Sequence, residues 1–166
     1  MRVGVPHYQV LDDFMRSRER VSCIMGPLGS GKTFAAVQRI LKQMTEQEAN
    51  AEGKRPTRWL AIRNTYGDLL STTIKDFISV FEGLGKMTYG GLAPPTFRVD
   101  FQLPDGTRVV SECIFLALDR DDSVRRLRGF QVTGIWFNEM KECVKSVVDM
   151  ADLRHGRYPS VASGGV

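Results

Sequence analysis

The 166 residues are 42% hydrophobic, which predicts a single α/β domain with one core, spanning residues 1–166. Lysine and arginine (23) outnumber aspartate and glutamate (19), and the net charge of +4 favours contact with a polyanion without requiring it. No stretch approaches the roughly 18 apolar residues of a membrane span, and the amino terminus has no signal-peptide pattern. These features exclude a membrane protein and predict a cytoplasmic one.

The three cysteines, Cys23, Cys113 and Cys143, lie in apolar segments. They form no C-x-x-C pair, and their number is odd. We therefore expect reduced, buried cysteines with no disulfide and no zinc site.

The first fifty residues predict a helix, a strand and a second helix. Apolar residues fall on one face of a short helix over 8–15. Residues 20–25 have the composition of a buried strand that ends at the start of a glycine-rich stretch. Apolar residues then recur at helical spacing from Lys32 and stop in the polar run 46–55, which predicts a helix followed by a loop.

Between that strand and that helix lies a sequence that fits G-x-x-x-x-G-K-[ST] at every fixed position. It consists of Gly26, Pro27, Leu28, Gly29, Ser30, Gly31, Lys32 and Thr33. Several backbone N–H groups must meet phosphate oxygens at once, and glycine allows the backbone to turn and approach closely enough. The motif therefore predicts a P-loop whose eight residues bind a nucleotide.

Two side chains of this motif have separate roles. Lys32 brings a positive charge to the β- and γ-phosphates, and Thr33 offers its hydroxyl to Mg²⁺. The helix that begins after Gly31 directs the positive end of its dipole at the same anion. We expect ATP and Mg²⁺ as cofactors; the alternative is a glycine-rich turn that happens to contain a lysine.

A second strand is predicted over 58–63. The polar residues 64–68 follow at its carboxyl end, where open α/β sheets bind ligands. An amphipathic helix is predicted over 69–81 and ends at Gly83 and Gly85.

The second half of the chain predicts a β-hairpin, a strand and a helix. Alternating residues 97–101, the turn 104–107 and the apolar run 108–118 are typical of a hairpin. A further apolar strand is expected over 132–137, followed by a helix that begins near Lys141.

Asn138 and Glu139 stand at the tip of that last strand. A P-loop enzyme needs such a strand, the Walker B element, to bring an acidic pair to the metal and the attacking water. Asn138 can still accept a hydrogen bond from a metal-bound water, but it carries one negative charge fewer than aspartate, so Mg²⁺ should bind less tightly. Glu139 keeps the role of general base. The alternative is a plain strand followed by a polar turn.

With these motifs the chain resembles the ATPase part of the large terminase subunit of tailed bacteriophages. The resemblance covers most of the chain and is carried by residues 26–33, 63–73, 127–130 with 134–139, and 156–159. The second and third blocks are more specific for terminases than the P-loop. The family's fold is a P-loop NTPase of the ASCE or RecA type, with a mostly parallel sheet flanked by helices and an inserted β-hairpin. In that family Lys32 and Glu139 would be catalytic.

The resemblance also implies roles for residues outside the two motifs. Arg128 matches an arginine that in similar motors reaches the nucleotide of a neighbouring subunit and stabilises charge on the transferred phosphoryl group. Arg125 and Arg126 compete with it for this role. Gln9 lies where the family places a glutamine that contacts adenine. For all four, an ordinary solvated surface is the alternative.

The function implied by the resemblance is ATP hydrolysis coupled to translocation of double-stranded DNA into the procapsid. The implied partners are double-stranded DNA, the portal protein, the small terminase subunit and further copies of the subunit in a ring. Such a motor works in the host cytoplasm and, transiently, at the viral procapsid, without contact with a membrane.

Large terminases continue past the acidic pair with another strand and a nuclease domain, neither of which occurs in these 166 residues. In the family's sheet that strand lies between the Walker B and P-loop strands. We therefore expect residues 1–166 to form a partial ATPase domain, truncated after the Walker B strand and its following helix. A gap in the sheet would expose unpaired backbone groups and apolar faces, so we expect a complementing chain that carries the missing strands and the nuclease.

Two other functions stay open at this point. One is a P-loop ATPase of another class, such as a helicase-like or partition-type motor, which only the blocks 63–73 and 127–139 argue against. The other is a non-catalytic fragment that binds nucleotide and acts with a partner chain, which Asn138 and the absence of the further strand favour.

Overall fold

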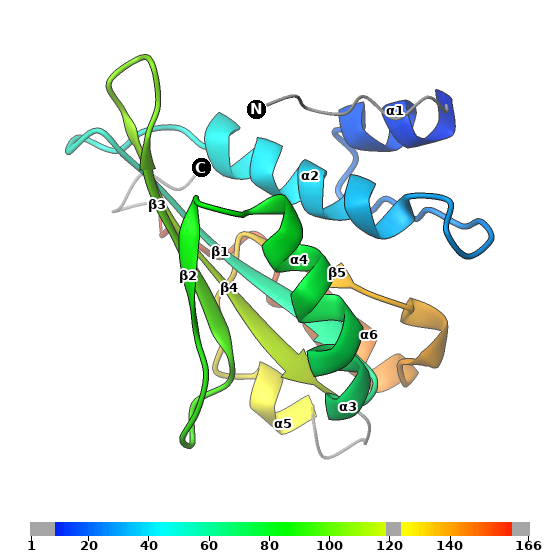
Figure 1. The fold of residues 1–166 in the computed structure, drawn as a ribbon. Helices are drawn as coiled ribbons and strands as arrows, with labels where there is room; N and C mark the ends of the chain where they lie inside the picture. Colours follow the sequence, from blue (N-terminus) through cyan, green and yellow to red (C-terminus); the bar gives the residue numbers. More distant parts are fainter. Residues whose placement is uncertain (1–8, 119–123, 161–166) are drawn as a thin grey trace.

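Figure 1 shows the computed structural model, which describes residues 9–118 and 124–160. A five-stranded sheet runs through the molecule in the order β2, β3, β4, β1, β5. The strands are β1 (Lys54–Arg63), β2 (Gly85–Thr88), β3 (Thr96–Gln102), β4 (Arg108–Ala117) and β5 (Gly134–Phe137). β1 is parallel to β4 and β5, whereas β3 is antiparallel to β4 and β2. The carboxyl ends of β1, β4 and β5 therefore share one edge of the sheet.

Helices cover both faces of the sheet (Figure 1). They are α1 (Gln9–Arg16), α2 (Lys32–Glu46), α3 (Tyr66–Asp68), the π-helix η1 (Leu69–Thr73), α4 (Ile74–Val80), α5 (Val124–Leu127), the 3₁₀ helix η3 (Met140–Glu142) and α6 (Lys145–Asp152). The buried side chains of α2 and α4 pack on one face, and those of α5 and α6 pack on the other. The result is a three-layer α/β arrangement.

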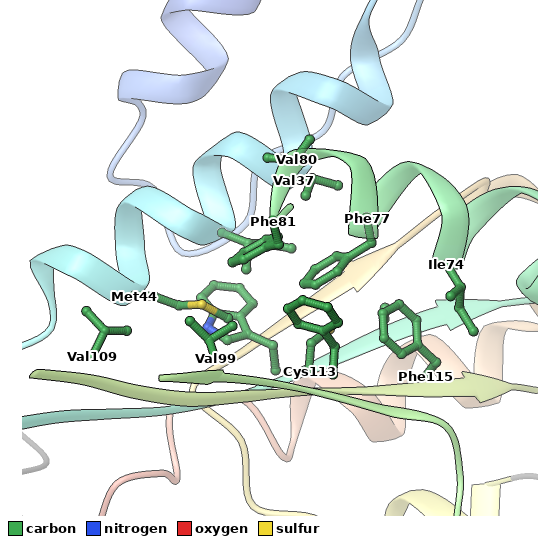
Figure 2. Packing of buried hydrophobic residues seen from close by; sticks show 14 of the residues in the cluster. Val37, Met44, Ile74, Phe77, Val80, Phe81, Val99, Val109, Cys113 and Phe115 are labelled. Carbon is green, nitrogen blue, oxygen red and sulfur yellow. The ribbon is translucent and has the colours of Figure 1, made fainter. Parts of the chain in front are cut away.

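The larger core lies between the sheet and helices α2 and α4, and it is rich in phenylalanine (Figure 2). Phe77 stacks on Phe81 with ring centroids 4.4 Å apart and meets Phe97 and Phe115 edge-on at 5.6 and 5.2 Å. All four rings are buried. Aromatic pairs of this kind add about 0.5–1.5 kcal/mol each beyond their burial, so the cluster fastens α4 to the β3–β4 hairpin.

The direction of α2 brings its first turn to the carboxyl ends of the parallel strands. Met44, near the end of α2, lies beside Val109 at the start of β4 (Figure 2). Val37, two turns earlier, lies toward the other end of β4, where Phe115 packs. Because α2 therefore runs against β4, the helix starts near the edge at which β1, β4 and β5 finish.

A glycine allows β5 to join the sheet beside a tryptophan. Gly134 is the register partner of Trp59, and a Cβ atom at Gly134 would come within 2.2 Å of the indole ring. Trp59 is buried, and its Nε1 donates to Thr57 Oγ1 at 3.2 Å. A larger residue at 134 would displace either the ring or β5.

The predicted α/β class is confirmed, as are the hairpin and the strand before Asn138. The predicted loop 46–55 is wrong at its end, because β1 already begins at Lys54. Arg55 attaches the polar first residues of β1 to the sheet, because its guanidinium donates to Thr107 Oγ1 and Asp105 Oδ2 of the hairpin turn, both at 2.8 Å. The four-residue edge strand β2 was not predicted, because Gly85, at which it begins, was taken for a helix stop.

The predicted buried strand over 20–25 is also wrong. These residues form no strand, and Val21 and Met25 are 65% and 87% exposed. β5 is the outermost strand on its side of the sheet, and within the described residues it has a ladder with β1 alone. The segment 20–25 pairs with no strand, although the outer edge of β5 has no partner among the described residues. Cys23 is exposed for the same reason, contrary to prediction, whereas Cys113 is buried as predicted and Cys143 is half-buried.

The predicted helix 69–81 begins earlier, at Tyr66, and contains the π-helical turn η1. The helix expected near Lys141 begins at Lys145, after a 3₁₀ turn. Across the two described ranges, no helix is both long enough and apolar enough to cross a membrane.

Candidate nucleotide-binding site

Residues 26–31 form a loop that opens directly into the first turn of α2, where Lys32 and Thr33 lie. Gly29 and Gly31 have φ angles of +73° and +79°, a backbone conformation that other residues rarely adopt. Gly31 caps the helix, and its carbonyl accepts a hydrogen bond from the N–H of Ala35 at 2.9 Å. The N–H groups of the first turn of a helix have no partner within it, so they are free to bind an anion at this loop.

Lys32 folds back over the loop. Its ammonium donates to the carbonyl oxygens of Gly26 (2.8 Å) and Pro27 (2.6 Å) and to Ser30 Oγ (3.2 Å). The Ser30 hydroxyl in turn donates to the carbonyl of Pro27 at 2.9 Å. A lysine ammonium has three donors, and here the loop's own oxygens take all of them. A phosphate that enters this cradle would compete for the same ammonium.

Helix α1 lies against this loop through one close contact. A Cβ atom on Gly31 would stand 3.4 Å from Leu11 Cδ1, and Leu11 is the buried residue of α1. Arg39 of α2 secures the same helix, because its guanidinium lies 5.0 Å from the centre of the Phe14 ring and donates to the carbonyl of Ser17 at 2.9 Å. The start of α2 is therefore packed on one side by α1.

The tip of β5 is tied to the end of β1 through Asn138. Its N–H donates to the carbonyl of Ile62 at 2.9 Å, and its own carbonyl accepts from Arg63 Nη1 at 3.3 Å. Its side-chain Nδ2 donates to Thr73 Oγ1 at 2.8 Å. No hydrogen bond from another described residue reaches Oδ1, so this oxygen is the atom that Asn138 can offer to a metal-bound water.

Glu139 is the only non-glycine residue with a left-handed backbone in the described parts of the chain, at φ +63° and ψ +58°. Such a conformation costs on the order of 1–3 kcal/mol and persists only where its surroundings impose it. The carbonyl of Glu139 accepts from the N–H of Glu142 at 3.0 Å, and its carboxylate lies 3.6 Å from the Lys141 ammonium. Backbone strain thus falls on the residue predicted to be the general base.

Arg63 is a residue of this region whose contacts the sequence analysis did not foresee. Its side chain is only 13% exposed, Nη2 lies 3.6 Å from a carboxylate oxygen of Glu142, and Nε is buried without a hydrogen-bond partner. An arginine at the last position of a strand, next to a polar loop, was the available signal. The guanidinium links the ends of β1 and β5.

The residues predicted only from the resemblance lie at exposed positions. Arg125 and Arg126 belong to α5, and Arg128 follows that helix. Arg126 Nη1 donates to the carbonyl of Ala117 at 3.4 Å, whereas Arg125 and Arg128 make no side-chain hydrogen bond or ion pair with any described residue. Gln9 is the exposed first residue of α1, the helix that packs beside the loop. Their predicted roles stay predictions.

The donors present suit a magnesium ion that arrives with the nucleotide. Within residues 9–118 and 124–160, no group of three or more His, Cys, Asp or Glu residues could hold a metal. Thr33, half-buried in the first turn of α2, offers a hydroxyl, and Asn138 offers an amide oxygen. Mg²⁺ in nucleotide sites keeps several waters and takes other ligands from the phosphates, so two such protein groups are compatible with it.

Comparisons with known proteins identify the family and the fold. A family model described as "Terminase large subunit, T4likevirus-type, N-terminal" matches residues 23–151. The structure of the large terminase from a thermophilic bacteriophage is similar with a TM-score of 0.62 and 14% identity, over 88% of this chain and 35% of that one. The same terminase in complex with ADP is similar with a TM-score of 0.59 and 17% identity, over 78% of this chain and 29% of that one. No curated protein matches the sequence.

Proposed function

This chain belongs to the family of T4-type large terminase subunits, within their N-terminal part, and we propose that it binds MgATP and hydrolyses it to move double-stranded DNA into a procapsid. The observation that supports the proposal most is the cradle around Lys32. Its ammonium is held by three oxygens of a loop that has two left-handed glycines. The loop opens into a helix that starts near the edge where β5 presents Glu139.

Each part of the site acts on a different part of the nucleotide. Lys32 exchanges its bonds to Gly26 and Pro27 for bonds to the β- and γ-phosphates, and the first-turn N–H groups of α2 bind phosphate oxygens. Glu139 accepts the proton of the water that attacks the γ-phosphate. When bound, Mg²⁺ would neutralise charge on the phosphates; the Thr33 hydroxyl would hold it directly and the Asn138 amide through a bound water.

The test of nucleotide binding is Lys32→Ala compared with Lys42→Ala. Both lysines lie on α2, but Lys42 is exposed and faces Glu46 at 3.7 Å on the far part of the helix. Hydrogen bonds to charged groups contribute about 1.5–3 kcal/mol each, so we expect Lys32→Ala to weaken ATP binding by about 100-fold and Lys42→Ala to leave it unchanged. Equal ATP affinities for the two variants in calorimetry would overturn the assignment of the loop.

The two residues at the tip of β5 should behave differently from each other. Glu139→Gln should keep ATP binding and abolish ATP hydrolysis, measured in the assembly that is active with the wild-type chain, because the substitution removes only the base. Asn138→Asp should strengthen magnesium-dependent binding, because it restores a carboxylate to the surroundings of the metal. Loss of binding with retained turnover in Glu139→Gln would show that the roles are assigned wrongly.

A second candidate is that these residues act only with a complementing polypeptide that contributes a strand beside β5. The exposed apolar side chains of Val21 and Met25 support it, as does the position of β5 at the edge of the sheet. An added strand would pair with β5 and cover the segment 20–25. Without it, the chain would be a nucleotide-binding fragment rather than a complete motor.

In the complete motor we expect the partners of the family: double-stranded DNA, the portal protein, the small terminase subunit and a nuclease domain. We also expect a ring of subunits in which Arg128 reaches the nucleotide of the neighbour, acting in the host cytoplasm and at the procapsid. Arg128→Ala should then lower the ATPase rate of the assembled ring and leave nucleotide affinity unchanged, as steady-state and binding measurements on the same sample would show.

A further inference from the structure

Thr73 has a buried hydroxyl that contacts Asn138, the residue that follows β5 and lies far away in the sequence. The residue is fully buried, and Oγ1 accepts a hydrogen bond from Asn138 Nδ2 at 2.8 Å. The neighbouring Thr72 behaves differently, because its hydroxyl donates to the carbonyl of Asp68 in its own helix at 2.8 Å. Bonds within the helix are the usual ones for threonine, so the contact of Thr73 with the tip of β5 is a distinct feature.

The helix at this point has an unusual shape. Thr73 is the last residue of the π-helix η1, and α4 continues directly with the buried residues Ile74 and Phe77. π-helical turns are rare and often occur at functional sites. The turn delivers Thr73 to the β5 tip while α4 stays packed on the core.

The contact with Thr73 determines how the Asn138 side chain is oriented. An asparagine amide has a donor end and an acceptor end, so fixing Nδ2 also fixes the direction of Oδ1. The backbone of Asn138 is held as well, by Ile62 and by Arg63. A free amide could rotate and turn its N–H₂ group toward a metal-bound water. Because the cation polarises that water, the water is a poor hydrogen-bond acceptor, and this orientation would not bind it.

We infer that Thr73 positions Asn138 for the magnesium ion of the bound nucleotide. The inference rests on the nucleotide-binding function proposed above. Thr73 itself touches neither nucleotide nor metal; it acts through the Asn138 amide. Groups that orient metal ligands typically change metal affinity by about 10- to 100-fold, and for a contact through water we expect the lower end, about tenfold.

The experiment measures ADP affinity by calorimetry, with Mg²⁺ and with EDTA, in three variants of the full chain. Thr73→Val keeps the shape of the side chain and removes the acceptor, and Thr73→Ser keeps the hydroxyl. Thr72→Val makes the same change one residue away, where only a bond within the helix is lost. Thr73→Val should lower the ratio of the magnesium affinity to the EDTA affinity by about tenfold, with the EDTA affinity unchanged, while the other two variants keep the wild-type ratio.

A double-mutant cycle separates positioning from a general structural role. If Thr73 acts through Asn138, then Thr73→Val should have no further effect on the ratio in an Asn138→Ala background. A structural role alone would lower both affinities together, in either background. Thermal unfolding of each variant shows whether it is folded.

Four results would overturn the inference, and they differ in what they leave standing. An unchanged ratio in Thr73→Val, or an equal fall of both affinities, overturns the inference. ADP binding that depends on Lys32 but not on Mg²⁺ in the wild type also overturns it and leaves the proposed nucleotide site standing. ADP binding that does not depend on Lys32 overturns both.

Discussion

Two apolar regions of the molecule differ in how they are covered. Between the sheet and helices α2 and α4, Phe77, Phe81 and Phe115 are buried. In the segment 20–25, Val21 and Met25 are largely exposed. The difference lies in pairing: β1 and β4 each have a strand on both sides, whereas 20–25 has none. An apolar run becomes a buried strand only where the sheet supplies a neighbour.

The proposed nucleotide site straddles these two regions. Asn138 is anchored to β1 at the covered side, and α2 is anchored to the core by Val37 and Ile40. The loop before α2, in contrast, follows the segment 20–25 in the chain. The first residue of this segment, Arg20, forms an ion pair with Asp152 of α6. The phosphate loop is thus joined to the core through α2, whereas the segment before it has no ladder with the sheet.

The largest expected effect of a single substitution tests the covered region. Phe77→Ala removes the ring that stacks on Phe81 and meets Phe97 and Phe115, and it should cost about 3–5 kcal/mol of the free energy of unfolding. Lys75→Ala, at an exposed position of the same helix, should cost less than about 0.5 kcal/mol. Urea unfolding followed by tryptophan fluorescence measures both. A loss below about 1 kcal/mol for Phe77→Ala would show that this cluster is not the main core.

Thiol modification compares the two regions in the unaltered protein. Cys113 on β4 is buried, and burial raises its pKa well above the ordinary value, so little reactive thiolate is present; Cys23 is exposed. Because Cys113 reacts only after an opening that costs about 5 kcal/mol, we expect Cys23 to react about 10³- to 10⁴-fold faster with iodoacetamide. Mass spectrometry of a time course gives both rates. Similar rates would mean that β4 opens as readily as the segment 20–25.

The fold was predictable wherever local pattern and tertiary neighbours agree. The hairpin of β3 and β4 has alternating residues and a Pro-Asp-Gly turn, and β5 has a continuous apolar run, so both were predicted. The strand expected over 20–25 has an equally good pattern, yet its state depends on a neighbour that no local signal describes. The edge strand β2 could not be predicted, for the opposite reason. Its short polar sequence has no strand pattern of its own, and it forms a strand only because β3 pairs with it.

The candidate site was predictable at the level of its motifs and not of its contacts. The residues 26–33 and Glu139 could be located because glycine spacing and an acidic strand tip have a direct chemical meaning. The bond between Asn138 and Thr73 joins positions 65 residues apart, and the left-handed backbone of Glu139 depends on the turn that follows it. Neither has a signature in a single sequence.

Self-association should reveal the open edge. An exposed apolar segment and an unpaired edge strand each invite pairing with another chain, and a lysine placed in such a segment opposes it. Met25→Lys should weaken self-association by about tenfold, or 1.4 kcal/mol, whereas Leu92→Lys, at another exposed apolar position, should not. Sedimentation velocity measures the self-association of each variant. In addition, the same samples should hydrolyse ATP negligibly without a complementing polypeptide. A monomeric wild type with the turnover of a complete motor would show that the sheet needs no further strand.

The smallest expected effect is that of Met25→Ala, which is compared with the same substitution at Met44. Met44 lies on α2, and its buried side chain packs beside Val109 of β4. Met44→Ala should therefore cost about 2–5 kcal/mol of the free energy of unfolding. Met25 is exposed, so Met25→Ala should cost less than about 0.5 kcal/mol, because no apolar surface returns to water and no cavity forms. Equal losses would mean that the segment 20–25 is packed in solution. If a complementing strand covers this segment, Met25 becomes buried when that polypeptide is present. Met25→Ala should then weaken binding of the polypeptide by at least about tenfold, because it removes a side chain that the strand has buried.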